Sequence, residues 1–215
     1  MARKPADQSV SREDILLAAA DVLQRNGYEA TTMKDIAAAV NLTAASLYHH
    51  FRNKDALLLA VLEAGLEQVL SQIESIAQSD LPSPDKLLQM IKAHIIGLTQ
   101  NTAVGAAMVF EIRSLMGAKE PLPHASPADH LAYKTFVERR ALFFSRRDQF
   151  EDLFRQVVRQ GIENKSFHPV DVGIFTKTML GAHNWVGVWY KPEGRLSGEQ
   201  IAQLIAETLL RALKP

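Results

Sequence analysis

Cysteine is absent from this sequence of 215 residues. Its absence excludes a disulfide scaffold, a thiol nucleophile and a thiolate metal site, and it fits the reducing conditions of the cytoplasm. A membrane-spanning run is also missing, because no stretch reaches the roughly 18 uninterrupted apolar residues that a membrane helix needs. No charged start followed by an apolar run indicates a secretion signal. We therefore expect a cytoplasmic protein without a membrane partner.

An excess of charge of one sign is lacking too, since 24 Lys and Arg residues balance 24 Asp and Glu residues. The net charge therefore gives no bulk signal for nucleic acid, and DNA binding has to rest on local placement. The stretch from Lys34 to Lys54 contains Arg52 and two adjacent histidines, but Asp35 is its only acid. Positive charge is thus concentrated in this one stretch.

Motifs of common enzyme classes are missing as well. The chain has no G-x-S-x-G, no phosphate-binding lysine loop, no G-x-G-x-x-G and no H-E-x-x-H. His124 and His130 lie in or beside a proline-rich loop, but no matching set of acids accompanies them, which argues against a metal site there. We expect no catalytic residue, no cofactor and no bound metal.

What the sequence does contain is helical periodicity. Hydrophobic residues make up 47% of the chain, enough for the core of one large or two small domains. They recur at spacings of three and four, without strand alternation. Capping and breaking residues predict an all-α fold of about nine helices, near 11–27, 32–40, 43–50, 53–77, 83–98, 103–116, 128–163, 171–190 and 197–212. Within the seventh of these helices, residues 146–148 suggest a bend.

Local signals set several helix ends. Ser11 and Thr32 each precede an aspartate by three residues, which is the signature of a capped helix start. Thr43 is the cap predicted for the third helix, and Gly27 is expected to end the first helix. Ser83, followed directly by proline, is predicted to cap the fifth helix.

The helices divide into two predicted domains. Residues 1–55 hold three short helices after a flexible arm at residues 1–10, and residues 56–215 form a larger helical domain for ligand binding and dimerisation. Two short helices joined by a tight turn and braced by a third form a helix-turn-helix, which places its second helix in the major groove of DNA. Asn53 caps the long helix that links the domains. The side chains expected in the core of the first domain are Leu16, Ile36, Leu42, Leu47 and Phe51.

The helix predicted over 171–190 is apolar on almost every side, so both of its faces need cover. It also carries Gly173, Gly181 and Gly187, each of which costs about 1 kcal/mol in helix propensity. The close approach of a second backbone accounts for such glycines. We therefore predict a homodimer through the last two helices. The predicted interface consists of Phe175, Met179, Gly181, Trp185, Trp189, Ile201, Leu204, Ile205 and Leu209.

Two segments of the first domain resemble a known signature. Residues 31–37 read TTMKDIA, and residues 42–57 read LTAASLYHHFRNKDAL. Both are similar to the signature of TetR-family transcription regulators, and the resemblance covers roughly residues 11–60. It implies a homodimer that binds a palindromic operator, with its two reading helices about 34–36 Å apart or a multiple of that distance. It also implies an effector pocket in the larger domain.

The resemblance and the capping chemistry together supply candidate DNA contacts. These are Thr32, Lys34, Thr43, Ala44, Ala45, Ser46, Tyr48, His49 and Lys54. In the family, positions matching Tyr48, His49 and Lys54 meet backbone phosphates, although a solvated polar face is the alternative interpretation. Many family members have lysine where this chain has Ala44, and glycine or proline where it has Ala45. These alanines cannot hydrogen-bond a base edge, but they can meet a thymine methyl group.

An effector pocket is expected to be mostly apolar with a few polar groups. The candidate lining residues are His94, Met108, Phe110, Arg113, Tyr133, Phe136, Arg140, Phe144 and Trp185, with an ordinary core or surface role as the alternative for each. The segment from Trp189 to Ser197, WYKPEGRLS, resembles the connector of TetR-family members that sense acyl-CoA thioesters. Pro192 and Gly194 also suit a simple turn. Acyl-CoA is the first candidate effector, ahead of hydrophobic drugs and aromatic metabolites.

These features predict a ligand-responsive repressor that binds operator DNA as a homodimer and is released by a hydrophobic small molecule such as an acyl-CoA. Two alternatives come from other classes, namely a helical enzyme and a protein-binding adaptor without DNA recognition. The cations available for the phosphates of such an effector are Arg113, Arg139, Arg140, Arg146, Arg147, Lys191 and Arg195.

Overall fold

The fold is all-helical, as the sequence predicted. The computed structural model describes residues 10–118 and 120–214, which form nine α-helices and one 3-10 helix and contain no strand. The helices are α1 (Arg12–Ala30), α2 (Met33–Ala39), α3 (Ala44–His50), α4 (Lys54–Ala77), α5 (Ser83–Gln100), α6 (Thr102–Phe110), η1 (Ile112–Gly117), α7 (Pro127–Glu163), α8 (Val172–Trp189) and α9 (Gly198–Arg211). Apart from Val10, the predicted flexible arm lies outside the described residues.

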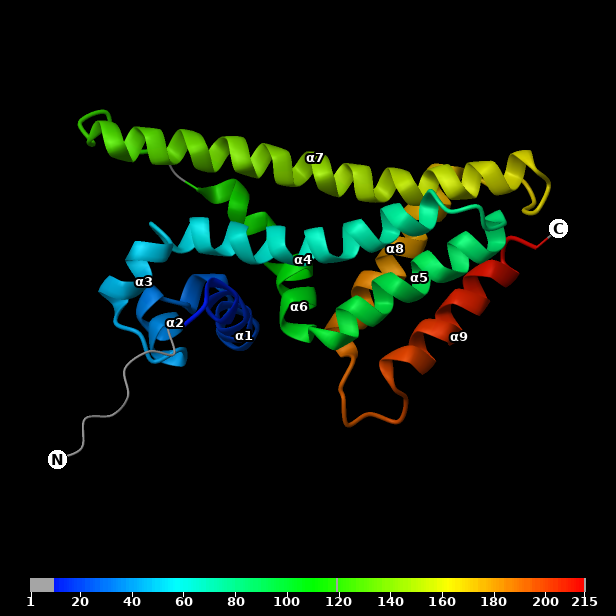
Figure 1. The fold of residues 1–215 in the computed structure, drawn as a ribbon, viewed down its shortest axis with the longest axis horizontal. Coiled ribbons are helices and arrows are strands. Elements are labelled where there is room, and N and C mark those ends of the chain that lie inside the picture. The colour runs from blue at the N-terminus through cyan, green and yellow to red at the C-terminus, as the bar shows by residue number, and fades with distance from the viewer. Residues whose placement is uncertain (1–9, 119, 215) are drawn as a thin grey trace.

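The molecule is elongated, with two unequal helical units (Figure 1). Helices α1 to α3 gather at one end, and α5, α8 and α9 lie at the other. Helices α4 and α7 pack against each other and run along the length of the molecule between the two ends. We call α1 to α3 with the start of α4 the N-terminal head, and the remaining helices with the rest of α4 the C-terminal domain.

A small apolar core closes the N-terminal head. Ile36 of α2 and Leu47 of α3 are fully buried, and Phe51 is 4% exposed just after α3. They pack with Leu16 of α1, while Leu42 in the α2–α3 turn is partly buried against the same cluster. The predicted core of the first domain is confirmed, so α3 is held by its inner side chains and its outer face is available for other contacts.

The predicted helix caps of the N-terminal head are formed. The side-chain oxygens of Ser11, Thr32, Thr43 and Asn53 accept hydrogen bonds from the backbone N–H groups of Asp14, Asp35, Ser46 and Ala56. Each cap satisfies an amide that the helix itself leaves unpaired, and such caps typically stabilise by about 1 kcal/mol. Helices α2 and α3 have 7 residues each. At that length a helix is stable only with caps and packing.

Gly27 kinks the first helix instead of ending it. Its φ is 74° and its ψ is 164°, after which helical turns resume as far as Ala30. The hydroxyl of Thr31 donates to the carbonyl of Gly27 at 2.7 Å and helps to close the kink. A positive φ is easy only for glycine, so the residue that was expected to stop the helix redirects it.

Two other predicted helix ends differ from the structure. Ser83 begins α5 but makes no capping bond, because its hydroxyl is buried and accepts from the Asn164 side-chain amide at 3.0 Å. This bond ties the start of α5 to the end of α7. The helix predicted over 103–116 ends at Phe110, and the chain continues as the 3-10 helix Ile112–Gly117. There the tighter bonding pattern between residues three apart replaces the α-helical one.

Helix α4 belongs to both units. Leu57 packs in the core of the head, whereas Leu66 and Ile73 are buried in the core of the C-terminal domain. Within the described residues, Lys54–Gln78 is the one helix long and apolar enough to cross a membrane by length and composition, and half of its apolar window is buried inside the protein. Its apolar character is explained by these two cores. The predicted domain boundary at residue 55, close to its first turn, stays a prediction.

Helix α7 is continuous over 37 residues, so the predicted bend at residues 146–148 is wrong. A helix of this length spans about 55 Å. Side chains of α7 contact side chains of α4 along the seam between the two helices. The contacts are the ion pairs Arg139–Glu63 and Arg146–Glu67 and the hydrogen bond from Gln149 to Glu74. No proline or glycine interrupts this part of α7, and the pairs hold it straight against α4.

Candidate nucleic-acid interface and effector region

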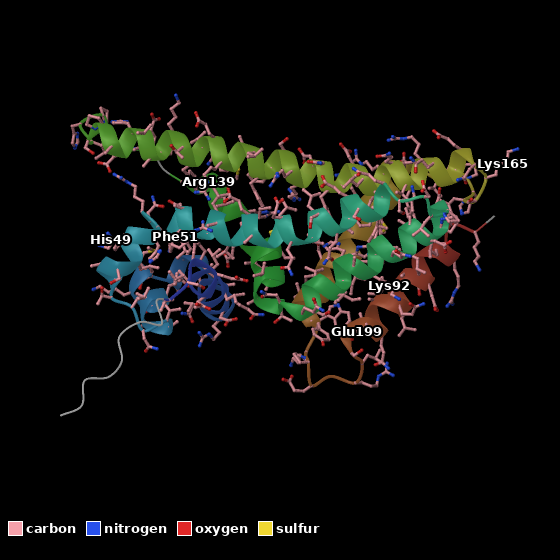
Figure 2. All side chains as sticks on the ribbon, in the orientation of Figure 1. His49, Phe51, Lys92, Arg139, Lys165 and Glu199 are labelled. Atoms are coloured by element: carbon pink, nitrogen blue, oxygen red, sulfur yellow. The ribbon has the colours of Figure 1, made fainter. Side chains whose placement is uncertain are left out.

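Helix α3 presents one apolar and one polar face. Leu47 is fully buried, whereas Tyr48 is 51% exposed and both His49 and His50 are exposed. Figure 2 shows His49 at the outer edge of the N-terminal head, at the opposite end of the molecule from Lys165. The outer face of α3 thus carries a phenol and two imidazoles that can donate hydrogen bonds to phosphate or base edges.

Small polar side chains stand at the starts of α2 and α3. The hydroxyl of Thr43 accepts from the Ser46 backbone at 3.0 Å and lies 2.9 Å from the Ser46 hydroxyl. Thr32 holds the start of α2 in the same way, and Lys34 beside it is exposed. Ala45 is exposed and Ala44 is half-buried. All these candidate DNA contacts except Lys54 therefore lie on α2 or α3 or at their caps.

Lys54 has a different set of partners. Its ammonium donates to the carbonyls of Tyr28 at 2.6 Å and Thr31 at 2.9 Å, and it lies 4.1 Å from the centre of the Tyr28 ring. Such carbonyls at a helix end carry partial negative charge and attract a cation. The hydroxyl of Tyr28 in turn donates to Asp55, and burial followed by this contact raises the pKa of that phenol. Lys54 therefore joins the end of α1 to the start of α4.

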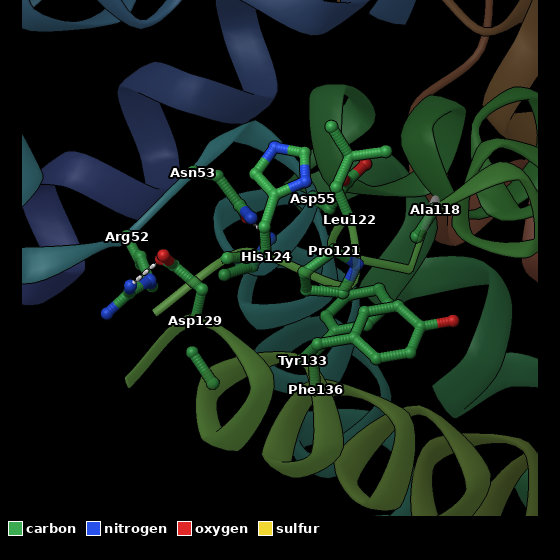
Figure 3. Close-up of a pocket in the computed structure, with 13 residues that line it drawn as sticks. Arg52, Asn53, Asp55, Ala118, Pro121, Leu122, His124, Asp129, Tyr133 and Phe136 are labelled. Carbon is green, nitrogen blue, oxygen red and sulfur yellow. Dashed lines mark hydrogen bonds and ion pairs between the residues drawn. The ribbon is translucent and has the colours of Figure 1, made fainter. Parts of the chain in front are cut away.

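A cavity of about 320 Å³, which we call the junction cavity, lies where the N-terminal head meets the start of α7 (Figure 3). Its walls include Leu122 of the loop before α7 and both Tyr133 and Phe136 of α7. Arg52 and Asp129 form an ion pair on one side of it, between the head and α7. The cavity thus combines an apolar wall with a charged edge, a composition found in small-molecule sites.

A pair of histidines is buried in the C-terminal domain. Nδ1 of His94 on α5 lies 3.2 Å from Nδ1 of His183 on α8, and the His94 ring meets the Phe150 ring edge-on with centroids 4.9 Å apart. Burial lowers the pKa of His94 to about 4 and lowers that of His183 well below its usual value. Both rings are therefore neutral near pH 7. Nε2 of His183 and the hydroxyl of Thr176 are buried without a hydrogen-bond partner.

Two family profiles match this chain. Residues 15–61 match the bacterial regulatory proteins of the tetR family, and residues 132–213 match a tetracyclin repressor-like C-terminal domain. The first match covers the capped helix-turn-helix, and the second covers most of α7 together with α8, which carries His183, and α9. The chain belongs to the TetR family. Membership makes it a helix-turn-helix transcription regulator and places it outside the enzymes, in agreement with the sequence prediction.

Similarity to individual TetR-family proteins extends along nearly the whole chain. The transcriptional repressor KstR2 of Mycolicibacterium smegmatis is 27% identical over 201 residues, which are 93% of this chain and 88% of the relative. The crystal structure of PfmR from Thermus thermophilus is 29% identical and covers 95% of this chain and 100% of its own, with a TM-score of 0.77. AibR, solved in complex with isovaleryl coenzyme A and operator DNA, is 27% identical over 94% of this chain and 97% of its own, with a TM-score of 0.72.

The residues predicted to line an effector pocket do not converge on one place in this TetR-family chain. Tyr133 and Phe136 line the junction cavity, and Arg140 lies over the Phe136 ring and donates to the Leu115 carbonyl at 2.8 Å. His94 belongs to the buried pair. Of the others, Met108 and Phe144 are half-buried against the core, while Phe110, Arg113 and Trp185 are exposed. The ligand role of each residue stays a prediction.

The predicted dimer interface of this TetR-family chain divides between two faces of α8 and α9. Met179 and Ile201 are buried in the core of their own chain, so we remove them from the interface. Trp185, Trp189 and Leu204 are exposed on the outside. The remaining predicted residues also reach this outer face, with Gly181 exposed and Phe175, Ile205 and Leu209 half-buried. A further apolar side chain that the prediction omitted, Ile174, is 66% exposed.

The glycines of α8 follow the same division. A Cβ atom on Gly187 would lie 3.5 Å from the backbone of Gly105, so this glycine faces α6 of its own chain. Nothing lies within 4 Å of the corresponding position on Gly181. The close approach of a second backbone was predicted for these glycines, and at Gly187 that backbone belongs to α6 of the same chain. Only Gly181 leaves open space on the outer face.

Sequence reasoning missed the contacts between distant segments. Arg52 and Asp129 are far apart in the chain, and no spacing pattern connects them. His183 carried a usable signal, because a histidine in an otherwise apolar helix resembles His94 in its own apolar stripe. Two such histidines in buried helices suggest a shared polar contact.

Proposed function

We propose that this TetR-family chain is a cytoplasmic homodimeric repressor that binds a palindromic operator and is released from it by an acyl-CoA thioester. The observation that carries the DNA-binding part is the outer face of α3, where Tyr48 and His49 are exposed above a fully buried Leu47. A helix fixed from beneath by a core leucine can enter the major groove without unfolding its support.

The candidate DNA contacts divide by chemistry. Tyr48, His49 and the exposed Lys34 suit phosphates, which position the protein without reading sequence. Thr43, Ala44 and Ala45 at the start of α3 suit base edges and thymine methyl groups. Thr32 and Ser46 suit phosphates that approach the capped helix starts. Lys54 differs from these because its ammonium is already bound by backbone carbonyls.

A dimer through α8 and α9 gives the operator its symmetry. Ile174, Trp185 and Trp189 on α8 and Leu204 on α9 are large apolar side chains about half or more exposed in the single chain. Exposed apolar surface of this kind marks an association site, and tryptophans are frequent energetic centres of interfaces. Two copies related by a two-fold axis would hold their reading helices one helical turn of DNA apart, or a multiple of it.

The effector assignment rests on AibR and on the buried histidines. AibR has been solved with isovaleryl coenzyme A. In this chain, Nε2 of His183 is buried without a hydrogen-bond partner beside the Phe154 ring of α7, and a polar group of an effector that entered this core would pair with it. Arg139 and Arg146 already pair with glutamates of α4. The exposed Lys191 and Arg195 of the α8–α9 connector are therefore better placed to meet the phosphates of coenzyme A.

A selection from random duplex DNA tests the DNA-binding part. The selected sites should be inverted repeats whose half-site centres lie one helical turn apart or a multiple of it. Fluorescence anisotropy with one selected duplex should show two chains bound per site. Selection of no common sequence, or of a single unrepeated half-site with one chain bound, would contradict the proposal.

Reciprocal binding tests the effector part. Short-, medium- and long-chain acyl-CoAs should be compared with free coenzyme A, which lacks the acyl group. An effector acts only by binding two states of the protein with different affinity, so an acyl-CoA that weakens operator binding by some factor must itself bind more weakly by the same factor when operator is present. A panel that changes neither operator affinity nor thermal stability would remove acyl-CoA as the effector and leave the DNA-binding proposal intact.

A further inference from the structure

Helix α7 connects the buried core of the C-terminal domain to the N-terminal head. Near its far end Phe150 and Phe154 surround the His94 ring, with centroids 4.9 and 6.4 Å from it. At its start Asp129 pairs with Arg52 of the head. Figure 1 shows the first turns of α7 reaching as far along the molecule as α3. The helix is continuous over 37 residues, so one structural element joins these two places.

Both members of the Arg52–Asp129 pair are held by local structure. Arg52 lies in the short connector between α3 and α4, directly after the buried Phe51. Asp129 accepts hydrogen bonds from the backbone and hydroxyl of Ser126 at 3.2 and 2.7 Å, in a capping box that starts α7. These bonds and the contact with Arg52 hold the pKa of Asp129 below its usual value. The carboxylate is therefore charged and oriented before Arg52 meets it.

The Arg52–Asp129 pair lies beside the junction cavity, where few other contacts join the head to α7. The cavity of about 320 Å³ lies beside Arg52 and Asp129, between the head and the start of α7. The cavity is open to solvent, so fewer packed side chains fix the angle between the two parts here than in a closed core. A single ion pair next to a cavity can form or break without disturbing a core. Figure 3 shows the pair spanning the edge of the cavity, with Tyr133 and Phe136 along its α7 wall.

We propose that the Arg52–Asp129 pair is a latch that positions α3 relative to α7 and thereby sets the affinity of the dimer for its operator. Arg52 is a positioning residue here, because it acts on the orientation of the reading helix. The inference rests on the proposed DNA-binding function. In a dimer both heads must fit one duplex at fixed spacing, so a change of angle at one junction disturbs both contacts.

The expected effect is moderate. Both side chains are close to half exposed, at 49% and 44%, and exposed ion pairs change equilibria by up to about fivefold each. Two junctions act on one operator. Breaking the pair is therefore expected to lower operator affinity by about three- to tenfold.

The direction in which Asp129→Asn changes operator affinity distinguishes the latch from simple electrostatics. Simple electrostatics says that removing a carboxylate near DNA raises affinity, because repulsion of phosphate is lost. If the pair acts as a latch, Asp129→Asn lowers operator affinity. Asp129→Glu keeps both the charge and the capping geometry and should retain wild-type affinity. An unchanged or raised affinity of Asp129→Asn would overturn the proposal.

Two control variants separate the latch from other effects. Ser126→Ala removes the capping bond of α7 and one bond that orients Asp129 but keeps the carboxylate for Arg52, so it should lower operator affinity less than Asp129→Asn does. Arg146→Gln breaks an ion pair of similar exposure on the same seam, away from the head, and it should bind operator within twofold of wild type. A loss in either control equal to that of Asp129→Asn would show that helix stability or general charge, rather than the latch, causes the effect.

A distance measurement tests the latch without DNA, so that failure of the proposed function and failure of the latch remain distinguishable. The chain has no native cysteine, so spin labels can be placed at Gln24→Cys on α1 and Ala141→Cys on α7, both of which are exposed. Labelled chains are mixed with excess unlabelled chains to isolate distances within one chain. Arg52→Gln should broaden the distance distribution, and the exchanged pair Arg52→Asp with Asp129→Arg should narrow it again. Identical distributions in all three proteins would overturn the latch.

Discussion

The N-terminal head buries apolar side chains and exposes polar ones, whereas the C-terminal domain buries two histidines and exposes several large apolar side chains. Beneath Tyr48 and His49 the head has a compact apolar core. The C-terminal domain buries the neutral pair His94 and His183, and it exposes large apolar side chains such as Trp185. The head is built to meet a charged partner in water. The C-terminal domain is built to meet apolar partners, inside and on its surface.

The largest expected effect comes from a change in the core of the N-terminal head. Leu47→Ala removes a fully buried side chain beneath α3 and should cost about 3 kcal/mol, within the 2–5 kcal/mol of such changes. Because the head is small, it should unfold at a lower temperature than the C-terminal domain and lose operator binding. Calorimetry and anisotropy check this result, and the exposed neighbour Tyr48→Phe is the control that should leave unfolding unchanged. A Leu47→Ala protein that melts as one unit with the C-terminal domain would contradict the separation of the two parts.

Another large effect is expected on the outer face of α8. Gly181→Leu places a bulky side chain where nothing lies within 4 Å in the single chain, so the fold should survive and the dimer should weaken by tenfold or more, about 1.4 kcal/mol. Gly97→Leu is the matched control, because Gly97 also has open space but lies on α5. Light scattering over a concentration series measures both. Equal association of the two variants and wild type would exclude α8 from the interface.

Acidification should affect the C-terminal domain before the head. Burial lowers the pKa of His94 to about 4, so between the ordinary histidine pKa of about 6.5 and that value the unfolded chain binds protons that the folded domain excludes. Stability is therefore complete above about pH 6.5 and declines as the pH falls towards 4, by about 1.4 kcal/mol for each unit. Urea unfolding at pH 7.5, 6 and 5 measures it.

A double variant checks the cause of that decline. Replacing both His94 and His183 by Leu should flatten the pH dependence of the C-terminal domain over the same range. The N-terminal head is the internal reference, because the histidines on α3 are exposed. An equally steep decline in the double variant would assign the effect to other groups.

The smallest expected effect distinguishes two lysines of the head. Lys34→Ala should weaken binding to every duplex alike and reduce the slope of log affinity against log salt by about one, as the loss of one phosphate contact does. Lys54→Ala should instead lower the melting temperature of the head, because its ammonium holds the carbonyls of Tyr28 and Thr31. A reduced salt slope with unchanged melting in Lys54→Ala would return this residue to the phosphate contacts.

The sequence predicted the head in detail because the head is organised by short-range rules. Ser11, Thr32 and Thr43 cap helices whose partners lie three residues away, and the core leucine Leu47 follows from helical spacing alone. Gly27 was the exception. A single positive φ lets the helix resume after a kink, and sequence spacing does not distinguish a kink from an end.

The C-terminal domain was predictable in composition but not in arrangement. The apolar helix α8 was recognised, yet which of its faces turns inward depends on α5, α6 and α7. Met179 was thus assigned to the interface although it is buried within its own chain. The Arg52–Asp129 contact joins segments far apart in the chain, and no local pattern predicts it. The two histidines in apolar helices indicated buried polar groups, but their spacing did not show that they contact each other. The candidate DNA contacts, in contrast, lie mostly on α2 and α3 or at their caps.

Sequence-specific DNA binding is tested by the affinities for operator and for a scrambled duplex of equal length, measured over a range of salt concentrations. We predict that two chains bind each operator and that the operator is preferred by about 10³-fold or more. Both affinities should fall with added salt, because phosphate contacts are common to the two duplexes. Equal affinity for the two duplexes at every salt concentration would contradict sequence-specific binding.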